Sequence, residues 1–317
     1  MWSKNASLAG GTLSLAGIPA AQLAKEFGTP TFFLDEDAYR ARALAWHNGL
    51  QSEFGAHAGT VYYAAKSFIC TAVAQWIADI GIGIDVCTGG ELAVALNGGI
   101  DPKKIEVHGN NKSVAEIDRA VSVGVKTIVM DSLFEIERVA AAAKKHGVRQ
   151  AVMLRLTPGI EAHTHEKIST AHEDVKFGFS IASGAAWAAI VAVRSQPSLE
   201  LRGIHAHIGS QIFDNNGFDI AAQRVIEFMA EIKAVNGIEF PDLDLGGGFG
   251  IAYVETDTPQ SVEAVINRMH EIVLGECKKH GLAIPHLSIE PGRAISGPST
   301  VTLYEVGTTK EVKLDGD

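Results

Sequence analysis

Eight short apolar runs alternate with segments of helical length, and this alternation constrains the fold more than any other feature of the sequence. The apolar runs are Val61–Lys66, Ile82–Val86, Ile105–His108, Thr127–Met130, Ala151–Leu156, Leu201–Ile208, Leu243–Leu245 and His286–Ile289. Strands that alternate with helices in this way indicate parallel βα units. Eight units predict an α/β fold, a (β/α)8 TIM-like barrel, ahead of an open doubly wound sheet.

The ends of the eight runs are unusually polar. In such barrels the chemistry takes place at the C-terminal ends of the strands. The residues at or next to these ends are Lys66, Asp85, His108, Asp131, Arg155, His207, Gly246 and Glu290. A purely structural barrel does not need so many ionisable groups at one rim, so this rim is the expected active site.

The first run, Val61–Ala65, ends at Lys66. Burying an ammonium group is costly, so a lysine that closes a buried strand is paired, reaches solvent or is kept for its amine. Considered alone, the segment favours a lysine that reaches solvent. The other residues of the rim favour chemistry at the amine.

A glycine run and a histidine pair close two other strands. Gly246, Gly247 and Gly248 allow backbone N–H groups to approach an anion such as phosphate, although glycine runs are often plain turns. His205 and His207 point to the same face of a strand and could ligate a metal ion, the basis of an alternative metal-dependent hydrolase. The nearby Gly209-Ser210 suits phosphate better, so we expect no metal.

Acidic residues and an arginine complete the rim. Glu290 and Arg293 either pair with each other or bind a cationic and an anionic group of a ligand separately. Asp85 is expected to support the site, and Glu91 lies where it would complement a helix dipole. Pyridoxal phosphate requires a particular set of groups: an amine, glycines for its phosphate, a ring, a carboxylate and an arginine. The sequence therefore predicts pyridoxal 5'-phosphate as the cofactor.

The composition limits the partners and the cellular compartment that we expect for this protein. The 317 residues are 46% hydrophobic and carry a net charge of −10, which argues against nucleic acid or an anionic membrane as a partner. No apolar run approaches the roughly 18 residues of a membrane span. Three widely spaced cysteines, Cys70, Cys87 and Cys277, indicate free thiols in a reducing cytoplasm.

Five segments together resemble the fold-type III pyridoxal-phosphate-dependent decarboxylases, and within them the diaminopimelate decarboxylases. They are Tyr63-Ala-Ala-Lys66, His108-Gly-Asn-Asn-Lys112, His205-Ala-His-Ile-Gly-Ser-Gln211, Leu243-Asp-Leu-Gly-Gly-Gly248 and Glu290-Pro-Gly-Arg293. The segment 159–179 is similar to the diaminopimelate branch rather than the ornithine or arginine branch. The resemblance covers essentially the whole chain.

The resemblance implies the role of each residue. Lys66 forms the imine with the cofactor, His207 stacks on its ring and Glu290 pairs with the pyridine nitrogen, which makes these three the catalytic residues. The implied cofactor-binding residues are Lys66, Asp85, Glu91, Arg155, His207, Ser210, Gly247, Gly248, Glu290, Gly292 and Arg293. Arg293 would also bind a substrate carboxylate.

The implied reaction is decarboxylation of meso-2,6-diaminopimelate to L-lysine, the last step of lysine biosynthesis, in a homodimer with active sites at its interface. Two alternatives remain open: a barrel that binds the cofactor without catalysis, and a decarboxylase of another basic amino acid. An alanine racemase is less favoured, because Glu290 would make a stronger electron sink than a racemase needs.

The expected domains are an N-terminal segment, 1–28, that belongs partly to a β-domain, a barrel, 29–296, and the start of a C-terminal β-domain, 297–317. Family members carry the proton-donating cysteine in that C-terminal domain, and none of the three cysteines here matches its motif. The proton donor is therefore unassigned.

Overall fold

The computed structural model describes residues 3–159, 176–207, 209–212 and 216–312. Its centre is a closed barrel of eight parallel strands: β5 (Ala58–Ala64), β6 (Gly83–Val86), β7 (Ile105–Val107), β8 (Thr127–Met130), β9 (Gln150–Thr157), β11 (Leu199–Ala206), β12 (Asp242–Asp244) and β13 (His286–Ile289). Pairing of β8 with β9 and of β13 with β5 closes the ring. The predicted (β/α)8 barrel is confirmed.

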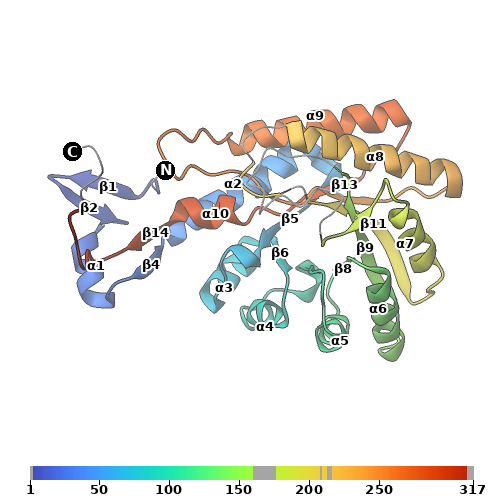
Figure 1. The fold of residues 1–317 in the computed structure, drawn as a ribbon, viewed down its shortest axis with the longest axis horizontal. Helices are drawn as coiled ribbons and strands as arrows, with labels where there is room; N and C mark the ends of the chain where they lie inside the picture. Colours follow the sequence, from blue (N-terminus) through green and yellow to red (C-terminus); the bar gives the residue numbers. More distant parts are fainter. Residues whose placement is uncertain (1–2, 160–175, 208, 213–215, 313–317) are drawn as a thin grey trace.

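Helices surround the barrel (Figure 1). They are α2 (Glu36–Phe54), α3 (Thr71–Ile80), α4 (Gly89–Asn97), α5 (Val114–Val123), α6 (Leu133–Lys145), α7 (Ala185–Arg194), α8 (Asn216–Asn236) and α9 (Val262–His280). Side chains cap several of them; Asp35 accepts a hydrogen bond from the Ala38 N–H at the start of α2, for example. The apolar helix faces and strand residues form one continuous core.

A smaller β-structure lies at one end of the molecule, beside the barrel (Figure 1). It contains an antiparallel meander of β1 (Ala6–Ala9), β2 (Thr12–Leu15) and β3 (Ile18–Pro19), followed by α1 (Ala20–Phe27). The strand expected near residues 298–306 is β14 (Thr300–Leu303), and it pairs antiparallel with β4 (Thr31–Leu34). Strands from both ends of the chain therefore meet here.

All eight barrel strands are parallel, so their C-terminal ends lie on one rim. In the strand order β13 is next to β5, and β6 separates β5 from β7. The residues that follow these strands therefore reach the same part of the rim. The short helix α10 (Arg293–Ser296) and the weak strand β10 (Phe179–Ser180) also follow strand ends there. Within the described residues, no helix is long and apolar enough to cross a membrane.

Candidate active site

Lys66 lies just beyond β5, in a 3-10 turn of residues Ala65–Ser67. Its Nζ contacts Asp85 Oδ2 at 3.4 Å, and 48% of its side chain is exposed. The side chain is both solvated and closely surrounded because it lies in a recess at the barrel mouth. Desolvation alone would lower the pKa of this ammonium group, but the carboxylates of Asp85 and Glu290 outweigh it and raise the pKa. The chain thus offers a positioned amine with open space around it.

Glu290 is buried directly after β13, the strand next to β5. Its Oε1 lies 2.8 Å from His205 Nε2 and 3.4 Å from His108 Nε2. Neither contact has the alignment of a hydrogen bond, so this oxygen has no hydrogen-bond partner among the described residues. Burial by itself would raise the pKa of Glu290, but His108, His205 and Lys66 hold it well below its ordinary value.

The two rings beside Glu290 are themselves neutral. Burial lowers the pKa of both His108 and His205, although Glu290 opposes that effect. We therefore take Glu290 as ionised and the rings as neutral.

Asp85 connects the amine to the carboxylate. It is fully buried on β6, with Oδ2 facing Lys66 and Oδ1 lying 3.8 Å from His108 Nε2. Burial raises the pKa of Asp85 to about 7, and Lys66 opposes the shift. Contacts thus run from Lys66 through Asp85 and His108 to Glu290, and all four lie at the same mouth of the barrel.

The two histidines of β11 and its end have different neighbours. His205 faces Glu290, whereas His207 Nδ1 accepts a hydrogen bond from the Gly247 N–H at 3.2 Å. Burial lowers the pKa of His207 well below its ordinary value, which leaves a neutral ring suited to stacking. The group of possible metal donors that includes His205 contains His108 and Glu290, not His207.

The loops after β11 and β12 are joined to each other. The Ile212 N–H donates to Gly248 O at 2.9 Å, and the Gly250 N–H donates to Ile212 O at 3.0 Å. The Gln211 side chain adds two further bonds, to the N–H and C=O of Ile251. This pairing holds Ser210, the residue before Gln211, beside the glycine run.

The glycine run is required by close packing. Gly248 has a φ of +96°, and a Cβ there would lie 2.3 Å from Gly209 O. A Cβ on Gly247 would lie 2.2 Å from Glu290 O. The Gly247 N–H is donated to His207 Nδ1, and the expected role of Gly247 at the cofactor stays a prediction. The Gly248 N–H has no hydrogen-bond partner in the described part of the chain.

The Glu290-Pro-Gly-Arg293 segment forms another edge of the mouth. Gly292 packs against β5, since a Cβ there would lie 2.8 Å from Ala64 Cβ. The Arg293 guanidinium donates to Tyr253 Oη. Within the described residues Arg293 has no ion pair with Glu290, which favours the reading in which the two bind separate groups.

Arg155 and Glu91 lie further from the amine. Arg155 on β9 stacks 4.3 Å from the Phe177 ring, with Nη1 3.8 Å from Asp131 Oδ2. Glu91 lies in the first turn of α4, which Thr88 caps, and its Oε2 accepts the Cys87 N–H at 2.6 Å. Their expected roles at the cofactor remain predictions.

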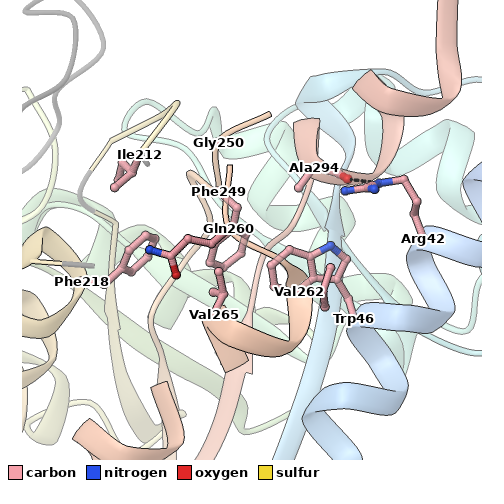
Figure 2. A pocket seen from close by; sticks show the side chains of 10 residues that line it. All are labelled: Arg42, Trp46, Ile212, Phe218, Phe249, Gly250, Gln260, Val262, Val265 and Ala294. Atoms are coloured by element: carbon pink, nitrogen blue, oxygen red, sulfur yellow. Dashed lines mark hydrogen bonds between the residues drawn. The ribbon is translucent and has the colours of Figure 1, made fainter. Parts of the chain in front are cut away.

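A small cavity behind the glycine loop is lined by residues of α2, α9 and both joined loops (Figure 2). Its volume of about 20 Å³ has room for roughly one water molecule, so it is not the cofactor site. Arg42 Nε crosses beside it to Ala294 O at 2.6 Å and so ties α10 to α2. Burial lowers the pKa of Arg42.

Sequence reasoning assigned no cofactor role to His108, His205 or Gln211, and it considered His205 only as a possible metal ligand. His108 was recognised only as a strand end and as part of a family segment, and its place beside Glu290 depends on barrel closure. Gln211 directly follows Gly209-Ser210, which was its only signal. The segment 159–179, which carried the diaminopimelate resemblance, lies largely outside the described residues, since 160–175 are not among them.

Comparisons with known proteins agree with this geometry. Residues 38–297 match the family model of the pyridoxal-dependent decarboxylase, pyridoxal binding domain. Diaminopimelate decarboxylase from Mycobacterium tuberculosis is 51% identical over 96% of this chain and 68% of its own length. That from Corynebacterium efficiens is 43% identical over 100% and 68%. The chain thus spans about two thirds of the length of these relatives.

A solved structure shares the fold. Diaminopimelate decarboxylase from M. jannaschii in complex with L-lysine has a TM-score of 0.88 and 30% identity, over 98% of this chain and 72% of that one. The chain belongs to the pyridoxal-dependent decarboxylases and, within that class, to the diaminopimelate decarboxylase family.

The residues present fit pyridoxal phosphate. Lys66 supplies an accessible amine, and Glu290 supplies a buried carboxylate oxygen without a hydrogen-bond partner among the described residues. The loop around Gly248 supplies an N–H without a hydrogen-bond partner in the described part of the chain and a close backbone approach. An amine, an anion for the ring nitrogen and a phosphate cradle are what this cofactor requires.

Proposed function

We propose that this chain is the cofactor-binding part of a diaminopimelate decarboxylase, which removes CO2 from meso-2,6-diaminopimelate and yields L-lysine. One observation carries the proposal. Lys66, Asp85, His108 and Glu290 come from four separate strand ends and form one connected group at the barrel mouth. The identity to relatives of that name, given above, supports the choice of substrate.

Lys66 holds the cofactor through its amine, and Asp85 keeps that amine in place. When bound, pyridoxal phosphate accepts the electron pair left behind as CO2 departs. Glu290 would face the ring nitrogen with its negative charge and favour the protonated form of that nitrogen. The His207 ring, fixed in orientation by its bond with Gly247, would stack on the cofactor.

The phosphate and substrate ends are assigned to the other rim residues. Ser210, Gly248 and Gly292 surround the expected phosphate position, and Asp85, Glu91 and Arg155 support the groups that hold the ring. Arg293 has its guanidinium at the rim, where it binds a substrate carboxylate; bidentate pairing is the geometry that arginine favours.

The test is cofactor binding followed by turnover. The purified chain is mixed with pyridoxal phosphate, the visible absorption of the lysine-bound cofactor is recorded, and CO2 release is measured with meso-diaminopimelate, ornithine and arginine. Turnover of meso-diaminopimelate alone supports the proposal. Turnover of ornithine or arginine would move the chain to another branch, and binding without any turnover would favour a non-catalytic barrel.

We further infer a homodimer with active sites at its interface and a cytoplasmic location. The family resemblance supports the dimer, and three free cysteines support the reducing compartment. Light scattering of the purified chain checks the mass of the assembly, and cell fractionation checks the location.

A further inference from the structure

A second layer of acidic side chains lies beneath the cofactor site. Glu106 is on β7 two residues before His108, and Asp244 is on β12 opposite His205 and Ser288. Side chains two residues apart on a strand point the same way, so these carboxyl groups lie one step deeper in the barrel than His108 and Glu290. Oxygens of Glu106, Asp244 and Glu290 all lie within 4.8 Å of one another.

This layer is closed to solvent. Glu106 and Glu290 are 2% exposed and Asp244 is 0% exposed. Each has one oxygen without a hydrogen-bond partner in the described part of the chain, Oε2, Oε1 and Oδ2 respectively. Ionised carboxylates can only accept hydrogen bonds, so three of them facing each other in a buried space need protons or a cation.

The nearby cations are already engaged. Lys126 donates to Thr60 Oγ1 at 3.0 Å and to Tyr62 Oη at 2.7 Å, and it lies over the Tyr62 ring. Lys66 contacts Asp85 at the mouth. The titratable and charged groups that face the layer are Tyr62, Lys66, Asp85, His108, Lys126, His205 and Asp242. Two ammonium groups do not balance four interior carboxylates.

We propose that Glu106 and Asp244 are positioning residues of the cofactor site, which stay protonated so that Glu290 presents the one charged carboxylate to the ring nitrogen. This inference rests on the proposed function. If all three carboxylates were ionised, their mutual repulsion would favour a proton on Glu290, and Glu290 would no longer stabilise a protonated ring. Protons on the deeper pair remove that repulsion.

Asp244 also reaches the phosphate side of the site. Its Oδ1 accepts the Gly246 N–H at 2.6 Å, while Oδ2 is the unpartnered oxygen. Burial and Glu290 raise the pKa of Asp244 well above its ordinary value, and the same two causes, opposed by Lys126, raise the pKa of Glu106 to about 8. These shifts agree with the geometry.

The first test uses the full chain without added cofactor, so it does not depend on activity. A carboxyl group that is protonated only in the folded state makes the folded state bind more protons than the unfolded state. The free energy of unfolding therefore falls as the pH rises from the unfolded pKa of that group to its folded pKa. We expect the Tm of the wild type to fall between pH 6 and 8, and Glu106→Gln or Asp244→Asn to reduce that fall by about one third to one half. Asp79→Asn is the control, because Asp79 is an exposed carboxylate that pairs with Arg40 on the outer helices and does not face the layer; it should keep the wild-type fall.

A second variant tests the connection to Glu290. Removing its charge in Glu290→Gln lowers the folded-state pKa of both deeper carboxyl groups, so the fall in Tm should begin at the same pH, set by the unfolded pKa, and end at lower pH. If the variants fold poorly, infrared spectra of the wild type still decide. A band of protonated carboxyl groups should be present at pH 7, well above the unfolded pKa values.

Three results would overturn the proposal: no such band, identical pH profiles in all variants, or a stoichiometric divalent cation found by elemental analysis. A chain that shows the band but binds no pyridoxal phosphate would contradict the proposed function and leave the protonation intact.

Discussion

Two lysines follow barrel strands on the same rim, and their surroundings are opposite. Lys112, after β7, is 2% exposed and donates three bonds of 2.6–2.7 Å, to Gly109 O, Val129 O and Glu135 Oε1. Lys66, after β5, is 48% exposed, and among the residues that the structure describes its Nζ has one polar contact, of 3.4 Å with Asp85. An ammonium group has three donors, so Lys112 is saturated and Lys66 keeps capacity for chemistry. The saturation of the donors, not the position in the barrel, separates a structural lysine from a reactive one.

The strongest test of this comparison is Lys66→Ala. We expect loss of the visible absorption of the bound cofactor and a fall in decarboxylase activity of on the order of 10³-fold or more. The Tm should fall less than in Lys112→Met, because the Lys66 side chain is half exposed and its contact with the buried Asp85 is long. Absorption spectra and thermal unfolding of the same samples check both. A variant that kept the absorption would contradict the assignment of the amine.

Lys112→Met should show the opposite pattern. It leaves Glu135 as a buried charge without its partner, which costs about 3–5 kcal/mol of the free energy of unfolding. Urea denaturation measures the loss. The matched control is the double variant Lys112→Met/Glu135→Leu, which removes both charges and should recover much of the stability. Equal stability of the single variant and the wild type would show that the pair is not saturated as described.

Gly248→Ala tests the phosphate side with a smaller effect. Its positive φ and the 2.3 Å approach to a backbone oxygen leave no room for a methyl group. We expect a loss of about 1–3 kcal/mol in stability together with weaker binding of pyridoxal phosphate. Titration of the cofactor into the variant, monitored by absorbance, measures the second effect. Gly275→Ala is the control, since a Cβ there meets nothing within 4 Å.

The smallest effect concerns pH. Asp85 contributes to the raised pKa of Lys66, and an amine must be deprotonated to attack an aldehyde. Asp85→Asn should lower that pKa, so the variant should take up pyridoxal phosphate faster at a given pH below it, by up to about tenfold for each unit of pKa. Stopped-flow absorbance between pH 7 and 9 records the rates. A slower uptake at every pH would mean that Asp85 chiefly orients the amine.

The sequence predicted the barrel well because alternation of strands and helices is a local signal. The bounds of β8 and β13 were predicted correctly, since in both the apolar pattern ends at a sharp polar break. The strand expected to run to Lys66 ends at Ala64, and a 3-10 turn carries the lysine. The strand β1 was missed, because Ala6–Ala9 is largely exposed and lacks the usual apolar pattern.

The convergence of rim residues was predictable, but their partners were not. Parallel strands alone bring Lys66, Asp85 and Glu290 to one mouth. The closeness of Glu106, His108 and Asp244 to Glu290 depends on the register and closure of the barrel, which no local pattern specifies. The use of the Gly247 N–H by His207 likewise depends on packing between two separate loops.

Gln211 fixes the position of the loop after β11 relative to the loop after β12. Its amide binds the N–H and the C=O of Ile251, the same exchange that a neighbouring backbone would make. A side chain thereby replaces a strand partner just where both strands have ended. The two loops are consequently tied by this amide as well as by the backbone bonds between Ile212 and the glycine turn.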